Sequence, residues 1–300
     1  MGSSTKSTRD GCEKSQGDTG PSSLGRPEGL RQRGVVEVVS TSERALWRSV
    51  MVPSEHGGWG LTLEPVLLGL LVAPSVAGGM IGVATFLIFL VRTPLKLVGV
   101  DVRRGRWLPR TRMAALVAAF ELMVIVVLAL GASARAGSSW WIAALVAAPF
   151  AAIELWFDVR SRGRRLLPEL CGASAVSAAV IAIVLAGGTT GTLAVALWLV
   201  LVARAVGAIP FVRTQIVRLR RGTADPAPAL WAQAVAIGLG FLAFLVDPGV
   251  WLGVGALMAL AAVQVAWLGR DPVPAKVLGM RQMGCGLALV IVTAAGAALV

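Results

Sequence analysis

The sequence LVARAVGAIPFVRTQIVRLRRG, at residues 201–222, carries a long apolar segment into a group of arginines. A similar sequence, ATFLIFLVRTPLKLVGVDVRRGRW at residues 84–107, does the same in the first half of the chain. Both segments end their apolar run with V-R-T and reach R-R-G a few residues later. An apolar run that ends in arginines is typical of a membrane helix that stops at a basic surface. The repetition predicts two such helices.

The composition of the whole chain agrees with a membrane protein. Of its 300 residues 56% are hydrophobic, and the mean hydropathy is +0.76. The net charge of +12 lies mostly between apolar runs, which is the pattern of membrane topology and not of nucleic-acid binding. The chain has a single histidine, and its three cysteines share no short spacing, so the sequence predicts neither a disulfide framework nor a zinc site.

Nine apolar segments are long enough, or nearly so, to cross a bilayer, because about 20 helical residues span about 30 Å of hydrocarbon. The sequence therefore predicts an all-α, polytopic protein of nine transmembrane helices. Their expected ranges are 58–76, 79–98, 112–131, 138–157, 167–187, 191–212, 229–246, 249–268 and 281–299. Residues 1–42 are rich in Gly, Ser and mixed charges and are predicted to be a disordered cytoplasmic tail, followed by a short interfacial helix at 43–51.

The basic residues predict the orientation in the membrane. The loops after the second, fourth, sixth and eighth segments and their flanks hold eighteen basic residues, whereas the other loops hold Arg135. The eighteen are Arg92, Lys96, Arg103, Arg104, Arg106, Arg110, Arg112, Arg160, Arg162, Arg164, Arg165, Arg213, Arg218, Arg220, Arg221, Arg270, Lys276 and Arg281. By the positive-inside rule this side is cytoplasmic, so we expect a cytoplasmic N-terminus and an extracytoplasmic C-terminus in a bacterial cell membrane.

The V-R-T sequences follow the second and sixth segments, which are four segments apart. An even number of crossings returns the chain to the same side, so the halves form a parallel repeat with a four-plus-four-plus-one arrangement. Each half also has a glutamate near the start of its first helix, Glu64 and Glu169. The alternative is that basic loops resemble each other simply because the positive-inside rule selects arginine.

Four motifs carry a resemblance to a known family. They are P-S-E-H-G-G-W at 53–59, L-V-R-T-P-L at 90–95, E-L-C-G-A at 169–173 and V-R-T-Q-I at 212–216. They resemble the YwiC-like family of bacterial membrane proteins, over about residues 50–300. The resemblance to that family does not imply a particular activity. The nine-helix layout also resembles, more distantly, the UbiA prenyltransferase superfamily, whose functional loops follow the second and sixth helices.

The resemblance to UbiA implies aspartate-rich motifs that hold Mg²⁺ and a prenyl diphosphate in those two loops. This chain has one aspartate in each, Asp101 and Asp225, which is a weak provision for a metal. Arginines stand there instead, and an Arg fork grips a phosphate or carboxylate without a metal. We therefore expect no cofactor, and an anion-binding site lined by basic side chains. The candidates are Arg92, Lys96, Arg103, Arg104, Arg204, Arg213 and Arg218.

Three charges lie deep inside predicted spans. They are Arg204, Glu121 and Glu154, and a charge at that depth usually faces a polar interior. They form either a functional network or a structural ion pair, and spacing alone does not show which acid meets Arg204. Arg92 and Arg213 either face the interior or extend to the lipid headgroups.

His56 and Glu55 lie at the mouth of the first span, beside two glycines that would let a ligand approach the backbone. A neutral histidine there is suited to proton transfer or to a headgroup contact. His56, Glu55, Glu121 and Glu154 are therefore the candidates for catalysis, if the protein is an enzyme.

Three functional classes remain open. The first is a binder or enzyme for an amphiphile with an anionic head at the cytoplasmic face, with membrane lipids as partners. The second is a transporter or permease for a small anion, with Arg204 and the glutamates on its path. The third is a non-catalytic membrane assembly component. The parallel repeat and the surface position of the arginines favour the first, since transporters often show inverted repeats.

Overall fold

The computed structural model describes residues 58–160 and 165–299. The predicted tail, the interfacial helix at 43–51, Glu55 and His56 lie outside these described residues. All of the described residues belong to one compact unit of the chain. Within them the structure is helical and contains no strand, which confirms the all-α prediction.

The helices follow the predicted segments closely. They are α2 (Gly58–Val72), α3 (Val76–Arg103), α4 (Pro109–Ala136), α5 (Ile142–Val159), α6 (Leu166–Ser177), α7 (Ala179–Ala186), α8 (Gly191–Arg221), α9 (Ala227–Val246), α10 (Trp251–Leu268) and α11 (Ala275–Ala298). In the described ranges, eight segments are long and apolar enough to cross a membrane, with α6 and α7 together forming one of them. The ninth segment corresponds to α2, which has 15 residues and begins at Gly58, the first residue that the structure describes. The chain is a multi-pass membrane protein.

The element order repeats. A short 3₁₀ turn, η1 (Ser139–Trp141), precedes α5, and a second, η2 (Pro248–Val250), precedes α10. The first half therefore reads α2, α3, α4, η1, α5, and the second reads α6–α7, α8, α9, η2, α10, with α11 left over. In the first half α3 packs along α4, and α8 packs along α9 at the matching place in the second. This order agrees with the four-plus-four-plus-one arrangement.

The two R-R-G sequences end helices. Gly105 follows the end of α3 with a φ of 64°, and Gly222 follows the end of α8 with a φ of 79°. Glycine adopts this left-handed conformation without the steric cost of a Cβ, which is why it commonly follows the last turn of a helix. The repeated glycine is thus explained by helix termination.

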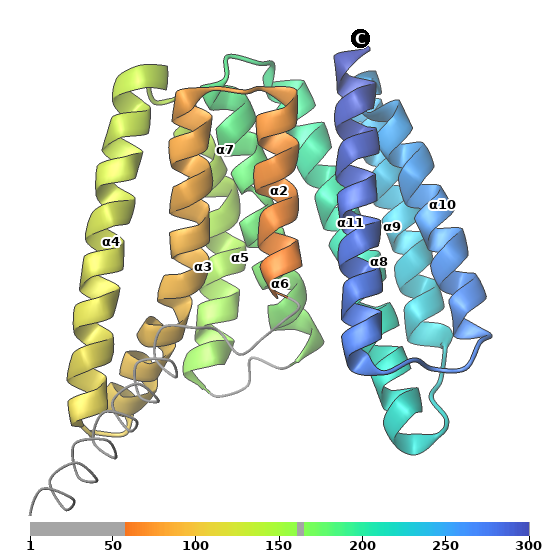
Figure 1. Ribbon diagram of the computed structural model, residues 1–300, viewed down its shortest axis with the longest axis horizontal. Helices are drawn as coiled ribbons and strands as arrows, with labels where there is room; N and C mark the ends of the chain where they lie inside the picture. The colour runs from red at the N-terminus through yellow and green to blue at the C-terminus, as the bar shows by residue number, and fades with distance from the viewer. Residues whose placement is uncertain (1–57, 161–164, 300) are drawn as a thin grey trace, which may run out of the picture. The chain divides into compact units, whose positions relative to one another are not determined.

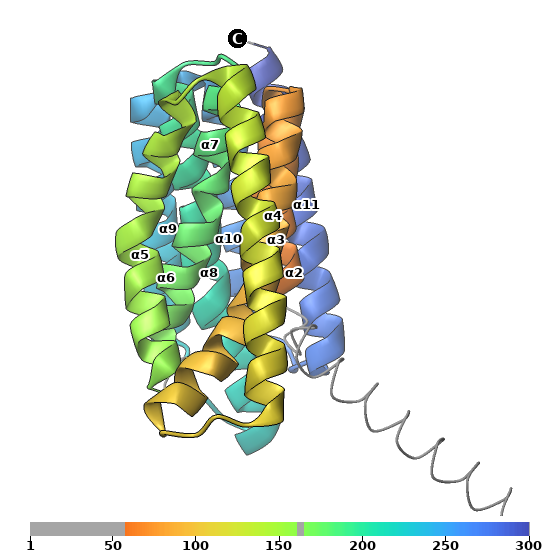
Figure 2. The same ribbon diagram turned by 90° about the vertical axis from the view of Figure 1, so that its left-hand side faces the viewer.

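The long helix α3 contains Pro94, whose ring cannot continue the helical hydrogen-bond ladder. Figure 2 shows the last turns of α3 leaning away from the rest of the helix, on the side of α5. Proline is the usual cause of such a bend. The bend brings the C-terminal part of α3 to α5, with which α3 is in contact.

The helices α2 and α7 join the two halves. The helix α2 packs against α11, α7 and α3, and α7 packs against α8 and α3 as well. Small residues allow these close approaches: Gly69 of α2 lies against Ile183, and Gly187 lies against Ala73. The residues Val180–Val184 of α7 are all almost completely buried, so the apolar core is centred on this short helix.

The turns α3–α4, α8–α9 and α10–α11 lie at one end of the bundle, and the C-terminus lies at the other (Figure 1). We call this end the basic end, because it carries the arginine-rich turns. The helix α8 has 31 residues, or about 46 Å at 1.5 Å per residue, so it exceeds the hydrocarbon thickness of about 30 Å. Its arginine-rich last turn (Arg218, Arg220, Arg221) therefore extends beyond the apolar layer.

Candidate functional site at the basic end

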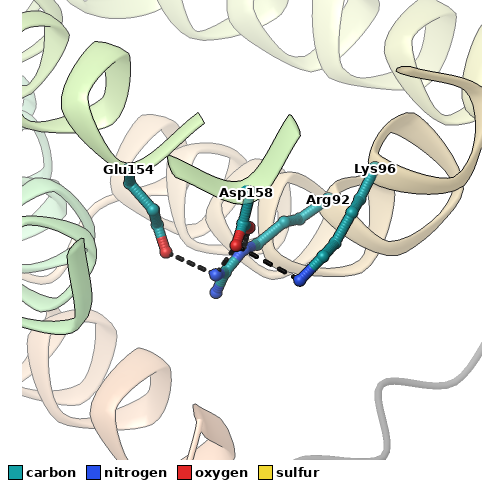
Figure 3. A network of polar contacts seen from close by, with 4 residues as sticks. All are labelled: Arg92, Lys96, Glu154 and Asp158. Carbon is teal, nitrogen blue, oxygen red and sulfur yellow. Dashed lines mark hydrogen bonds and ion pairs between the residues drawn. The ribbon is translucent and has the colours of Figure 1, made fainter. Parts of the chain in front are cut away.

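The charged side chains of α3 and α5 form an ion-pair network at the basic end (Figure 3). The Nε and Nη2 atoms of Arg92 lie 2.9 and 2.8 Å from Oδ2 of Asp158. The same Nη2 lies 2.7 Å from Oε1 of Glu154. The Nζ atom of Lys96 lies 3.2 Å from Oδ1 of Asp158. Arg92 therefore pairs with two carboxylates of α5 and Asp158 with two cations of α3.

Burial differs sharply between the acids and the bases of this network. The side chain of Asp158 is 1% exposed and that of Glu154 is 13% exposed, whereas Arg92 and Lys96 are 31% and 41% exposed. The carboxylates thus form the inner side of the network and the cations its outer side. An approaching molecule meets positive charge first.

A second ion pair lies on α6. Nη1 of Arg213, from α8, donates a hydrogen bond of 2.8 Å to Oε2 of Glu169. The carboxylate of Glu154 lies directly against Gly172, where a Cβ would clash with it. Residues three apart share a helix face, so Glu169 and Gly172 are neighbours on α6. Arg92, through Glu154, and Arg213 therefore reach adjacent positions on one face of α6.

We refer to Arg92, Lys96, Glu154, Asp158, Glu169 and Arg213 as the basic-end cluster. It joins the two halves, since α3 and α5 belong to the first and α6 and α8 to the second. Both V-R-T arginines are members. The sequence left open whether these arginines extend to lipid headgroups; the structure pairs each with a carboxylate instead.

Two further arginines cap helices. Nη1 of Arg103 donates to the carbonyl of Val159, the last residue of α5, at 3.1 Å. In the second half, Nη1 of Arg218 donates to the carbonyl of Leu268, the last residue of α10. Cationic side chains near a helix C-terminus satisfy its last carbonyls and interact favourably with its dipole. In both halves the second helix thus caps the fourth: α3 caps α5, and α8 caps α10. Arg104, next to Arg103, is exposed.

The two aspartates considered for a metal have local partners. Asp101 is buried and accepts a hydrogen bond of 2.7 Å from Oγ1 of Thr111, and its other oxygen lies 3.2 Å from Nη2 of Arg110. Asp225 is exposed and accepts from the backbone N–H of Ala227 at 2.9 Å. Both therefore order turns at the basic end. Across residues 58–160 and 165–299, no group of three or more His, Cys, Asp or Glu residues is arranged to hold a metal ion.

Arg204 lies elsewhere, inside the bundle on α8, and is 3% exposed. Its Nη2 donates to the carbonyl of Gln282 on α11 at 2.7 Å and lies 3.7 Å from Oε1 of Glu64 on α2. Glu64 is therefore the acid that meets Arg204, and not Glu121 or Glu154. Glu121 is buried on α4, and its Oε2 has no hydrogen-bond partner among the described residues.

A chain of glutamines continues from Arg204 through the second half. Nε2 of Gln233, on α9, donates to the carbonyl of Gly207 at 2.9 Å and to Oε1 of Gln264, on α10, at 2.7 Å. Nε2 of Gln264 donates to Oε1 of Gln282 at 3.3 Å. All three glutamines are buried. Four helices, α8 to α11, are thus joined by side-chain amides.

Sequence reasoning missed Asp158 and the glutamines. The signal for Asp158 was present, because Glu154 and Asp158 are four residues apart on α5 and match Arg92 and Lys96, four apart on α3. The signal for the glutamines was their placement: Gln233 and Gln264 each interrupt an otherwise apolar stretch, and Gln282 follows Arg281 at the start of another. A polar side chain in a membrane helix usually finds a partner on another helix.

Fold and site together define a polytopic helical membrane protein whose halves meet at a charged cluster. Residues 52–184 match the family model of YwiC-like proteins, so this segment of the chain is similar to that family. No curated protein and no solved structure matches the chain. The resemblance to UbiA enzymes therefore stays a prediction.

Proposed function

We propose that this YwiC-like protein binds the anionic head of an amphiphile at the basic end of the bundle. The observation that carries the proposal is the layering of the cluster. Asp158 is 1% exposed, whereas Lys96 and Arg213 are 41% and 39% exposed. Buried acids hold Arg92 and Lys96 in place, Arg213 pairs with the equally exposed Glu169, and the cations face outward, where lipid headgroups would lie.

The arrangement suits a phosphate or carboxylate head. Arg guanidinium groups bind such anions through charge-assisted hydrogen bonds, and a lysine adds a point charge. A bound head would compete with Glu154 and Glu169 for Arg92 and Arg213, while the more deeply buried Asp158 would keep Arg92 and Lys96 oriented. Cations already fixed by carboxylates lose little conformational freedom when the anion binds.

We place this surface at the cytoplasmic face, because the basic turns of both halves lie at this end of the bundle and positive charge favours the cytoplasmic side. The proposal is binding and includes no reaction. Glu154 is ion-paired with Arg92. That pairing makes it a positioning group in this account and not a catalyst.

The test is a titration of purified full-length protein in detergent with a short-chain phosphatidic acid, compared with phosphatidylcholine of the same chain length. Lys96→Met should weaken binding of the phosphatidic acid about tenfold, since one charge-assisted bond contributes about 1.5 kcal/mol. Lys276→Met is the matched control, because Lys276 is an exposed lysine at the same end, and it should have no effect. Equal binding of the two lipids would contradict the proposal.

The same titration in EDTA tests the absence of a metal. Binding should be unchanged, because the cluster grips the anion through cationic side chains alone. Loss of binding in EDTA and its recovery with Mg²⁺ would show that the arginine grip is wrong. Asp101 and Asp225 would then become candidate ligands.

A further inference from the structure

The guanidinium of Arg204 has unused hydrogen-bond donors deep inside the bundle. Its Nε and Nη1 atoms are buried and have no hydrogen-bond partner among the described residues. The carboxylate of Glu64, at 3.7 Å from Nη2, is beyond hydrogen-bond distance. A buried donor without a partner costs about 1–3 kcal/mol, and more when it is charged. The site therefore lacks an acceptor.

A small cavity is lined in part by Arg204. Its volume is about 10 Å³, and its lining includes Arg204, Gly207, Gln233 and Gln264, with small and apolar side chains such as Ala261 completing it. This volume accommodates about one water-sized particle. Phosphate, sulfate or an organic acid would not fit.

The glutamines do not supply the missing acceptor. Oε1 of Gln264 accepts from Gln233, Oε1 of Gln282 accepts from Gln264, and no glutamine oxygen in the described ranges accepts a hydrogen bond from Nε or Nη1 of Arg204. Gly207 matters here, because a Cβ at this position would lie 2.9 Å from Oε1 of Gln233. Close packing thus surrounds the cavity, and Arg204, whose Nε and Nη1 have no partner among the described residues, is one of the residues that line it.

We propose that this cavity is a binding site for a monatomic anion of halide size, held by Nε and Nη1 of Arg204. An anion stabilises a buried guanidinium more than a neutral acceptor does, because it adds a direct charge–charge attraction to the charge-assisted hydrogen bonds that either would accept. The apolar surroundings increase this difference. The site is separate from the basic-end cluster and does not depend on the function proposed for that cluster.

Glu64 competes with the anion in this account. Its carboxylate is 5% exposed and lies against Gly286 of α11, so it can hardly move away from Arg204. Two negative charges beside one guanidinium repel each other. Removing the charge of Glu64 should therefore strengthen halide binding, which is the opposite of what a purely structural ion pair predicts.

The test is the thermal stability of purified full-length protein in detergent, in sodium bromide against sodium gluconate at equal ionic strength. A ligand that binds the folded state raises the Tm as its concentration rises. Bromide should raise the Tm of the wild type in a saturable way. Glu64→Gln should shift the half-saturating bromide concentration downward about tenfold.

Two variants should abolish the bromide effect. Ala261→Val fills the cavity without changing a charge, and Arg204→Met removes the donors. Arg221→Met, an exposed arginine on the same helix, should behave as the wild type. If Arg204→Met fails to fold, the opposite responses of Glu64→Gln and Ala261→Val still decide the question. Equal bromide effects in all variants, or none in the wild type, would overturn the proposal.

Crystals grown in bromide give the direct answer. An anomalous peak within hydrogen-bond distance of Nε and Nη1 of Arg204 is the expected result. A peak at this place without anomalous signal would show that a water occupies the cavity, and the anion site would be rejected.

Discussion

In the first half of the chain, Arg92 of α3 pairs with two carboxylates of α5, whereas in the second half Arg213 of α8 pairs with one carboxylate of α6. The two arginines occupy the same V-R-T sequence. Measured from the glycine that ends each helix, however, they are not equivalent: Arg213 lies nine positions before Gly222, as Lys96 does before Gly105. Arg92 lies one helical turn, or about 6 Å, further from the basic end.

The two halves thus share the way in which their second helix ends, but not the side-chain pairs along it. The R-R-G glycines and the helix-capping arginines, Arg103 and Arg218, match in both halves. The buried acid Asp158 has no acidic counterpart in the second half. Neither α9 nor α10 contains an acidic residue, and the polar side chain of α10 is Gln264. The repeated R-R-G sequence therefore gives α3 and α8 the same helix end. The position of Arg92, one turn further from that end than Arg213, gives it different ion-pair partners.

The largest expected effect concerns the parallel arrangement itself. Alkaline phosphatase, which is active only outside the cytoplasm, should be inactive when fused after Gly105 or Gly222 and active when fused after Gly188 or the C-terminus. The reason is that matching turns of a parallel repeat lie on the same side, and the positive-inside rule predicts that the basic side is cytoplasmic. Opposite results at Gly105 and Gly222 would contradict the parallel repeat. Reversed results at all four sites would show that the basic end faces away from the cytoplasm.

A large difference in stability should separate the two ion-paired regions. Asp158→Asn leaves two cations beside a buried neutral group and should lower the free energy of unfolding by about 2–3 kcal/mol. Glu169→Gln should cost less than about 1 kcal/mol, because both Glu169 and Arg213 are more than a third exposed. Unfolding in mixed micelles at increasing SDS measures both. Equal losses in the free energy of unfolding would show that the deeper burial of Asp158 does not make its ion pairs more stabilising than that of Glu169.

A smaller effect is expected where the two regions touch. Gly172→Ala places a methyl group against the Glu154 carboxylate and should destabilise the protein by about 1–3 kcal/mol. Gly238→Ala is the matched control on α9, because open space surrounds it, and it should be neutral or stabilise by up to about 1 kcal/mol. The same unfolding assay compares them. No change in the free energy of unfolding for Gly172→Ala would mean that the Glu154 side chain can move away from α6 without destabilising the protein.

Much of the fold could be predicted from the sequence, because length and apolarity locate a membrane helix without any tertiary information. The bounds of α9 and α10 differ from the predicted spans by two residues. The ends of α3 and α8 could not be placed so well. Their amphipathic last turns continue the helix beyond the apolar layer, to Arg103 and Arg221, where hydropathy gives no signal.

The candidate site was less predictable for a physical reason. Sequence position gives the depth of a charge along its helix, but not which of several neighbouring helices it faces. Arg204 therefore had no assignable partner until α2 was placed beside α8 and α11. The break between α6 and α7 at Ala178 was equally invisible, since neither proline nor glycine marks it.

The most direct test of the central claim, that both halves contribute to one anion site, is a double-mutant cycle on Arg92 and Arg213. Each change to Gln should weaken binding of short-chain phosphatidic acid by about tenfold to a hundredfold, as expected for charge-assisted bonds of roughly 1.5–3 kcal/mol. The double variant should lose less than the sum, because a site that lacks one arginine holds its ligand loosely for the other. Zero coupling energy with intact binding would contradict the account and leave the two arginines as separate structural pairs.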